Sequence, residues 1–267
     1  MPQESIIDTS KPNAGRIYDY ILGGNHNFEV DRQAAAKILQ LLPSLQKVLR
    51  LQRWCLQDVA TELTKRRGFD IIIDFASGLP TNDHIHHVVP KGTKIIYSDW
   101  DPVVVDYAQE ILKGTSDVHY FHADARRPEE LINRPEVEEI LGGRRNVGIV
   151  YWGVSGFLAD DDIAHAAKFL YEWSDKNNVW AFNLLGADMD TSDPQALMVG
   201  KIYEQMGSPL YPRSKESYIG LLHPWKADKG GFVRLLEWHG LDEKEIAAED
   251  KRSWGQGGGG YGSYLVK

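Results

Sequence analysis

Residues 69–81 read FDIIIDFASGLPT, a short apolar run followed by a turn of small residues. The three isoleucines at 71–73 are typical of a strand, and their unbroken apolar character is typical of a strand buried on both faces. Similar runs occur at 94–101, 118–124, 146–154 and 178–186. Segments of helical character separate the runs, at 81–89, 102–113, 128–141 and 160–175. This alternation predicts an α/β fold in which helices cover both faces of a parallel sheet.

The two ends of the chain have a different pattern. Apolar spacing predicts N-terminal helices at 14–22, 31–42 and 44–66, and C-terminal helices at 192–206 and 214–222. Two strand candidates follow, at 232–240 and 262–267, and we expect them to pair antiparallel at one edge of the sheet. We therefore expect an N-terminal helical cap over residues 1–66 and a ligand-binding core over residues 67–267.

Charge and cysteine content restrict the class of function. The chain has 267 residues and a net charge of −8, which disfavours tight nucleic-acid binding because phosphate contacts require clustered Lys and Arg. Cys55 is the single cysteine, so no disulfide can form within the chain. The sequence shows neither a signal-peptide pattern nor a long apolar segment, so we expect a cytoplasmic protein that does not associate with membranes.

Candidate binding residues follow the predicted strands, because ligands of open α/β sheets bind at the carboxyl ends of the strands. The turn after the first strand is small enough to let a ligand approach the backbone. The second strand ends in Asp99, whose carboxylate suits the two hydroxyls of a ribose, and the third places Asp124 near an adenine edge. The cofactor-binding candidates at these ends are Asp74, Ala76, Ser77, Gly78, Asp99, Trp100, Asp124, Ala125 and Trp152.

Two classes of nucleoside-bearing ligand compete for these strand ends. A dinucleotide site requires G-x-G-x-x-G, and only Gly78 is present here. S-adenosylmethionine has no phosphate, and its ammonium and sulfonium groups suit an acidic, small-residue turn. The pattern favours a methyltransferase. A non-catalytic module that binds S-adenosylmethionine and a nucleotide-dependent oxidoreductase remain the alternatives.

Four stretches carry a family resemblance: RIYDYILGGNHNF, DFASGLPTNDHIHHV, IIYSDWDPVVV and HADARRPEEL. In this order they resemble the S-adenosylmethionine-dependent methyltransferase-like family first described as an actinobacterial domain of unknown function. Asn25-His26 and Ala76-Ser77-Gly78 stand where the family usually has Lys-Asp and Gly-Thr-Gly. The resemblance implies the class I methyltransferase fold, with a seven-stranded, mostly parallel sheet and an antiparallel last strand. It implies S-adenosyl-L-methionine as cofactor and leaves the methyl acceptor open.

The stretch YDYILGGNHNF, residues 18–28, precedes the sheet. In class I methyltransferases the variable part before the core lies over the carboxyl ends of the strands, so we expect this stretch to cap the cofactor. Gly23 and Gly24 would form a tight turn beside the cofactor, and Tyr18, Tyr20 and Phe28 would present aromatic faces to the sulfonium. The alternative is that these aromatic residues only pack the cap onto the core.

The sequence identifies no clear catalytic residue. His26, His86 and Tyr151 are weak candidates for a general base. His84, His86 and His87 form no complete ligand set, so we expect no metal. An Asn/Asp-Pro-Pro-aromatic motif is absent and the chain is acidic, so we expect a small-molecule methyl acceptor and no nucleic-acid partner.

Overall fold

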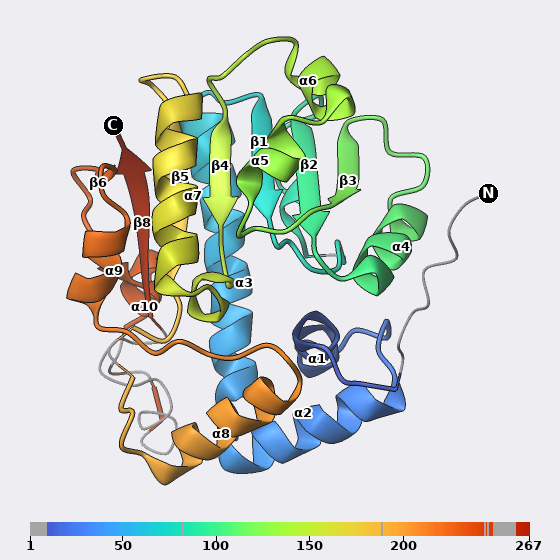
Figure 1. Ribbon diagram of the computed structural model, residues 1–267, viewed down its shortest axis with the longest axis vertical. Coiled ribbons are helices and arrows are strands. Elements are labelled where there is room, and N and C mark those ends of the chain that lie inside the picture. Colours follow the sequence, from blue (N-terminus) through green and yellow to red (C-terminus); the bar gives the residue numbers. More distant parts are fainter. Residues whose placement is uncertain (1–9, 82, 188, 243, 245, 248–259) are drawn as a thin grey trace.

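The computed structural model describes residues 10–81, 83–187, 189–242, 244, 246–247 and 260–267. Within these residues the chain forms one mixed sheet of order β3-β2-β1-β4-β5-β8-β6, with helices on both faces (Figure 1). The parallel strands are β1 (Ile71–Phe75), β2 (Lys94–Asp99), β3 (Val118–His122), β4 (Gly148–Tyr151) and β5 (Val179–Leu184). The last strand, β8 (Tyr261–Val266), is antiparallel to β5. The predicted fold class is therefore confirmed.

The described residues contain eight strands, and seven were predicted. The difference arises because β6 (Lys226–Ala227) and β7 (Val233–Arg234) both pair with β8, one at each end of it. These two short strands share one position in the sheet. The predicted strand over 232–240 is wrong beyond residue 234, where α10 (Leu235–Trp238) begins. The adjacent Leu235 and Leu236 are both buried, a pattern that a half-exposed edge strand cannot produce because its side chains alternate between faces.

The strand side chains alternate between two apolar cores. Ile71 and Ile73 point to one core, and Ile72 points to the other. The first core is covered by α5 (Pro128–Ile132), α6 (Pro135–Leu141), α7 (Asp160–Trp173) and α9 (Lys215–Leu221). The second is covered by α3 (Leu45–Thr61), which continues as a π-helical turn (Glu62–Arg66), together with α4 (Pro102–Ile111) and α10. Burial on both faces explains why the strand sequences are continuously apolar.

Two predicted helices differ in the structure. The range 81–89 contains only a 3₁₀ turn (Ile85–His87), because the buried His84 ring accepts a hydrogen bond from the Ile85 N–H and holds the backbone outside a regular helix. The range 128–141 is divided into α5 and α6. Pro135 divides it, since proline lacks an N–H and keeps Arg134 in an extended conformation.

A third apolar core lies at the end of the sheet toward which the parallel strands point (Figure 1). It is built by α1 (Ala14–Ile21), α2 (Glu29–Leu41) and α8 (Pro194–Gln205), with Ile17, Ile21, Ile38 and Val199 among its buried residues. Helix α3 lies against the sheet, whereas the sequence pattern places it in the cap. The helical cap therefore draws on both halves of the sequence, and the division of the chain at residue 66 stays a prediction.

Candidate functional site

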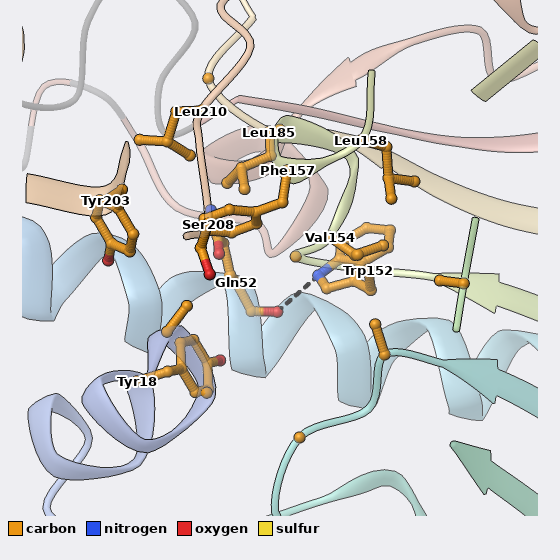
Figure 2. Close-up of a pocket in the computed structure, with 18 of the residues that line it drawn as sticks. Tyr18, Gln52, Trp152, Val154, Phe157, Leu158, Leu185, Tyr203, Ser208 and Leu210 are labelled. Carbon is orange, nitrogen blue, oxygen red and sulfur yellow. Dashed lines mark hydrogen bonds between the residues drawn. The ribbon is translucent and has the colours of Figure 1, made fainter. Parts of the chain in front are cut away.

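A cavity of about 440 Å³ lies at the carboxyl ends of the parallel strands (Figure 2). The residues that follow β1, β2, β3, β4 and β5 each contribute to its wall, and helices α1, α3 and α8 close it from the other side. Its volume is within the usual range for sites that bind small molecules and cofactors. The sheet topology therefore places a ligand-sized space where the sequence predicted one.

The turn after β1 forms one wall of this cavity with residues 76–78. Ala76 has a φ of 53° and Gly78 a φ of 65°, so both residues are in the left-handed region. Glycine adopts this conformation freely, but for Ala76 it costs about 1–2 kcal/mol. Hydrogen bonds hold this strained turn: the Ser77 hydroxyl donates to the Asp74 carbonyl oxygen at 2.6 Å, and the Tyr120 hydroxyl donates to the Gly78 carbonyl oxygen at 2.6 Å. Strain maintained in this way is common at binding sites.

Asp99, at the end of β2, presents its carboxylate to the cavity beside this turn. Its Oδ2 accepts a hydrogen bond from the Gly78 N–H at 3.1 Å, and its Oδ1 accepts one from the Asp101 N–H at 2.9 Å. Burial raises the pKa of Asp99 to about 6. Asp101 lies outside the cavity wall, where its Oδ1 caps α4 by accepting from the Val103 N–H at 2.8 Å. The two neighbouring carboxylates thus have different environments.

Asp74 and Arg53 are buried ionisable groups with unused hydrogen-bonding atoms. Asp74 is 1% exposed and its Oδ2 has no partner, and burial raises its pKa to about 8 against the opposing charge of Arg53. Arg53, on α3, is 4% exposed and lines the cavity, and its Nε and Nη1 have no hydrogen-bond partner. Its guanidinium lies 5.3 Å from the centre of the Tyr18 ring. Buried groups of this kind usually have partners, so their unused atoms indicate a ligand.

Trp100, Asp124 and Ala125 line the same cavity after β2 and β3. The Trp100 ring is 49% exposed, which leaves an aromatic face available to a flat ligand. The Asp124 carboxylate accepts from the Arg126 guanidinium at 2.6 and 2.8 Å. Burial alone would raise the pKa of Asp124, but the hydrogen bonds from Arg126 lower it overall, so the carboxylate stays charged. Trp152, after β4, completes the set of predicted residues in the wall and donates from its Nε1 to the Gln52 carbonyl oxygen at 2.9 Å.

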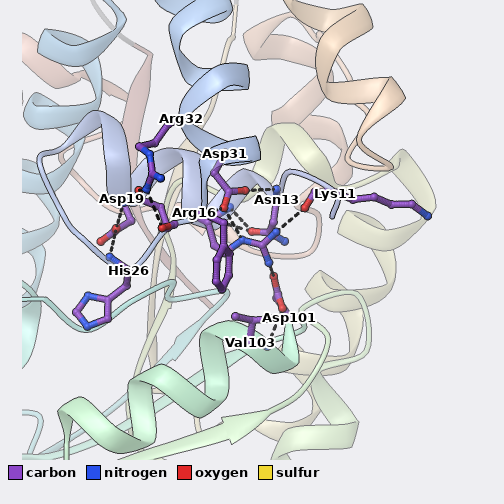
Figure 3. A network of polar contacts seen from close by, with 12 residues as sticks. Lys11, Asn13, Arg16, Asp19, His26, Asp31, Arg32, Asp101 and Val103 are labelled. Carbon is purple, nitrogen blue, oxygen red and sulfur yellow. Dashed lines mark hydrogen bonds and ion pairs between the residues drawn. The ribbon is translucent and has the colours of Figure 1, made fainter. Parts of the chain in front are cut away.

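Four other predicted cofactor residues, Asp74, Tyr20, Gly23 and Gly24, do not line the cavity; Asp74 lies within β1, behind the turn at 76–78. The turn at Gly23 and Gly24 instead wraps around Asp19, whose Oδ2 accepts from the His26 N–H at 2.9 Å (Figure 3). Tyr20 packs in the core of the cap. Tyr18 is the aromatic residue of this stretch that reaches the wall.

Arg16 connects the cap to the sheet beside this turn (Figure 3). Its buried guanidinium pairs with Asp31 of α2 at 2.9 Å and with Asp101 before α4 at 3.3 Å. It also lies 5.3 Å from the centre of the Phe28 ring. Phe28 therefore packs within this network and not in the cavity wall.

None of the weak candidates for a general base lines the cavity. Tyr151 is fully buried and donates its hydroxyl to the Ala125 carbonyl oxygen at 2.8 Å, and burial raises its pKa well above the ordinary value. His86 lies 3.0 Å from the Tyr97 hydroxyl, and burial lowers its pKa to about 4. His26 packs against the ring of Tyr107. We therefore assign none of the three to catalysis.

Several lining residues escaped the sequence analysis. Arg53 and Gln52 occupy α3 positions that read as a polar face, and only their burial at 4% and 3% exposure reveals their place. Phe157, Leu185, Tyr203 and Leu210 come from separate segments with no shared motif. No local signal distinguishes Arg53 from the other cations of α3, Lys47 and Arg50.

In the part of the chain that the structure describes, no three His, Cys, Asp or Glu side chains gather as a metal site. His84 uses one ring nitrogen for the Ile85 N–H and the other for the Ser77 carbonyl oxygen at 3.0 Å. Over the same residues, every helix is too short or too polar to cross a bilayer.

Comparison with known proteins extends the sequence resemblance. The model of a family described as S-adenosyl methyltransferase matches residues 1–261. No curated protein matches the chain. A candidate methyltransferase from Thermobifida fusca has a TM-score of 0.82 and 24% identity over 98% of this chain and 97% of its own. A DUF574 family protein from Streptomyces avermitilis has a TM-score of 0.82 and 24% identity over 98% of this chain and 99% of its own. At this identity the two structures show a shared fold.

Proposed function

The chain belongs to the S-adenosyl methyltransferase family, and we propose that it transfers a methyl group to a small molecule held in the cavity between the sheet and α8. S-adenosyl-L-methionine is the cofactor of this family, and its sulfonium supplies an activated methyl group. The chain's own residues then have to bind two molecules, align them and keep water away. Alignment alone can supply roughly 7–11 kcal/mol of the barrier in reactions of this kind.

The unused atoms of Arg53 and Asp74 support an amino-acid subsite at the β1 end of the cavity. The Arg53 guanidinium can donate from Nε and Nη1 to the α-carboxylate of the cofactor, a planar match that arginine makes well. Asp74 lies in β1, two residues before the turn at 76–78, and its unpartnered Oδ2 can accept from an α-ammonium bound beside that turn. The α-carboxylate would give Arg53 a counter-charge, and the α-ammonium would favour the charged form of Asp74.

Residues at the ends of β2 and β3 support a nucleoside subsite. The Asp99 carboxylate has lone pairs left for the ribose hydroxyls, although it already accepts two backbone hydrogen bonds. Trp100 offers a stacking face for the adenine, and Asp124 offers an acceptor for the exocyclic amine. Arg126 holds the Asp124 carboxylate in one orientation. With the nucleoside here and the amino acid at β1, the methyl group faces the part of the cavity formed after β4 and β5.

One observation carries this proposal: a single cavity is lined near β1 by the buried Arg53, which has unused hydrogen-bond donors, and near α8 by an apolar wall. The cavity is small and the chain is acidic, which supports a small-molecule acceptor over a nucleic acid. The apolar wall limits water around the reacting atoms.

Two ligands that differ in the amino-acid group test the assignment of the amino-acid subsite. S-adenosylhomocysteine carries the amino-acid group, whereas 5′-methylthioadenosine lacks it. Calorimetric titration should show that Arg53→Met and Asp74→Asn each weaken S-adenosylhomocysteine binding by about tenfold, the loss of one charged hydrogen bond, and leave 5′-methylthioadenosine binding unchanged. Asp99→Ala should weaken both ligands. If Arg53→Met weakens both ligands equally, the amino-acid subsite is not where we place it.

Catalytic turnover needs a separate test. S-adenosylhomocysteine release should be followed with S-adenosylmethionine and pools of small molecules, peptides or RNA. We expect product only with a small-molecule pool, and product with the peptide or RNA pool alone would reject the proposed acceptor class.

A further inference from the structure

The half of the cavity formed after β4 and β5 has a largely apolar wall, in which Asp162 is the one charged side chain among the described residues (Figure 2). Its apolar and aromatic side chains come from the segments after the two strands, from α8 and from the segment after α8: Val154, Phe157, Leu158, Leu185, Tyr203 and Leu210. The rings of Phe157 and Tyr203 contact each other with centres 5.5 Å apart at an angle of 59°. Gln52 and Ser208 add hydrogen-bonding groups without charge.

Every charged side chain that lines the cavity already has a different task or partner. Arg53 and Asp99 belong to the cofactor half, and Arg126 holds Asp124. Asp162 accepts from the Ala159 N–H at 3.2 Å at the start of α7. Among the described residues, no His, Cys, Lys or Glu lines the cavity. A charged acceptor would therefore lose its hydration without gaining a partner.

Three tyrosines line the cavity, Tyr18, Tyr203 and Tyr211, and a phenol hydroxyl is a poor proton acceptor. Burial raises the pKa of Tyr203 to about 12, and burial also raises the pKa of Tyr18, so both hydroxyls stay protonated near neutral pH. A general base should have a pKa near the working pH. Among the lining residues that the structure describes, none outside the cofactor half has a free group suited to remove a proton from the attacking atom.

We propose, on the basis of the function proposed above, that the methyl acceptor is an uncharged aromatic molecule that attacks through the lone pair of a ring nitrogen. The nitrogen lone pair forms the new bond to the methyl carbon while the carbon–sulfur bond breaks, and the electron pair of that bond stays on sulfur. The positive charge passes from sulfur to nitrogen and no proton leaves. Phe157 and Tyr203 pack against the acceptor, and their ring faces attract the charge that develops on nitrogen.

Three probes of similar size separate this acceptor class from its alternatives. Isoquinoline is neutral and has a free lone pair. 1,2,3,4-Tetrahydroisoquinoline is cationic at neutral pH, and 2-naphthol must lose a proton before it attacks. With the full chain and S-adenosylmethionine, mass spectrometry should detect N-methylisoquinolinium at a rate at least about tenfold above the methylated products of the other two probes. A preference for either of the other probes, or no transfer to isoquinoline while S-adenosylhomocysteine binds, would overturn the inference.

Two substitutions locate the acceptor. Phe157→Ala should lower kcat/KM for isoquinoline by about tenfold with unchanged S-adenosylhomocysteine affinity, because a buried aromatic contact is lost. Leu197→Ala, on the exposed side of α8, is the matched control and should have no effect. Leu210→Glu should shift binding toward tetrahydroisoquinoline by adding a partner for its charge. If Phe157→Ala leaves kcat/KM for isoquinoline unchanged and Leu210→Glu leaves the probe preference unchanged, the acceptor binds elsewhere. Failure of the wild-type chain to bind S-adenosylhomocysteine would overturn the proposed function itself.

Discussion

Asp99 and Asp101 are two residues apart in the sequence and differ completely in what they contact. Asp99 faces the cavity, whereas Asp101 caps α4 and pairs with Arg16. We expect Asp99→Ala to weaken S-adenosylhomocysteine binding by about tenfold or more, the loss of charged hydrogen bonds to the ribose. Asp101→Ala should instead lower thermal stability by about 0.5–2 kcal/mol through the lost cap, with little change in affinity. Titration and melting of both variants check this, and a reversed pattern would contradict our placement of the ribose.

Asp74 gives the protein a stability that depends on pH. Its pKa is about 8 in the folded chain because burial disfavours the charged form, and its ordinary value is 3.8. The neutral side chain therefore contributes stability that is fully present below the unfolded pKa and is lost as pH rises toward 8. Asp74→Asn removes this titration. We expect the stability of the wild type relative to Asp74→Asn to fall steadily between about pH 4 and 8, as measured by urea unfolding. A constant difference over that range would show that the carboxyl group is not held neutral.

At the scale of elements, the connection between α1 and α2 depends on one close approach. A Cβ at Gly24 would lie 1.9 Å from Asp19 Oδ1, and Asp19 also holds the His26 N–H and the Asn27 side chain. Gly24→Ala should therefore open this turn and destabilise the chain by about 1–3 kcal/mol. Gly200→Ala is a suitable control, because neither Gly24 nor Gly200 has a positive φ and no atom lies within 4 Å of the missing Cβ of Gly200. Equal melting temperatures for the Gly24 variant and the wild type would contradict the role of Asp19.

The elements also show what sequence patterns can and cannot predict. The five parallel strands were predicted because burial on both faces leaves an unbroken apolar signal. The helix expected at 81–89 failed because a buried side chain, His84, competes for the backbone. The strand ends located Asp99 and Trp152, which follow from topology. Arg53, Phe157 and Tyr203 meet only through the packing of α3 and α8, which no local pattern reports.

At the scale of the whole molecule, the last strand supports the cavity wall. A Cβ at Gly262 of β8 would lie 2.8 Å from Cη2 of Trp152 and 3.0 Å from the Trp238 ring. Trp152 is held on its other side by the Gln52 carbonyl oxygen of α3, so it has little freedom to move away. Gly262→Ala should therefore displace Trp152, weaken S-adenosylhomocysteine binding several-fold and lower stability by about 1–3 kcal/mol. Calorimetry and thermal melting measure both effects.

A glycine elsewhere in the fold provides the control for that substitution. Gly220 in α9 has no atom within 4 Å of a missing Cβ, so Gly220→Ala should keep affinity and add about 0.5–1 kcal/mol of stability through helix propensity. Unchanged binding in Gly262→Ala would show that the Trp152 side of the wall is not used by the cofactor.

The shared core of α1, α2 and α8 has a consequence for how the chain is made. Roughly 150 residues separate the end of α2 from the start of α8, and the two segments bury each other. At about 5–20 residues per second, a ribosome needs on the order of ten seconds to synthesise that interval. During this time the apolar side chains of Ile17, Ile21 and Ile38 cannot pack against α8, because α8 has not yet been synthesised. The strands β1 to β5 emerge before α8, so the ligand cavity is completed late in synthesis, and nascent chains that end before α8 should not retain cofactor.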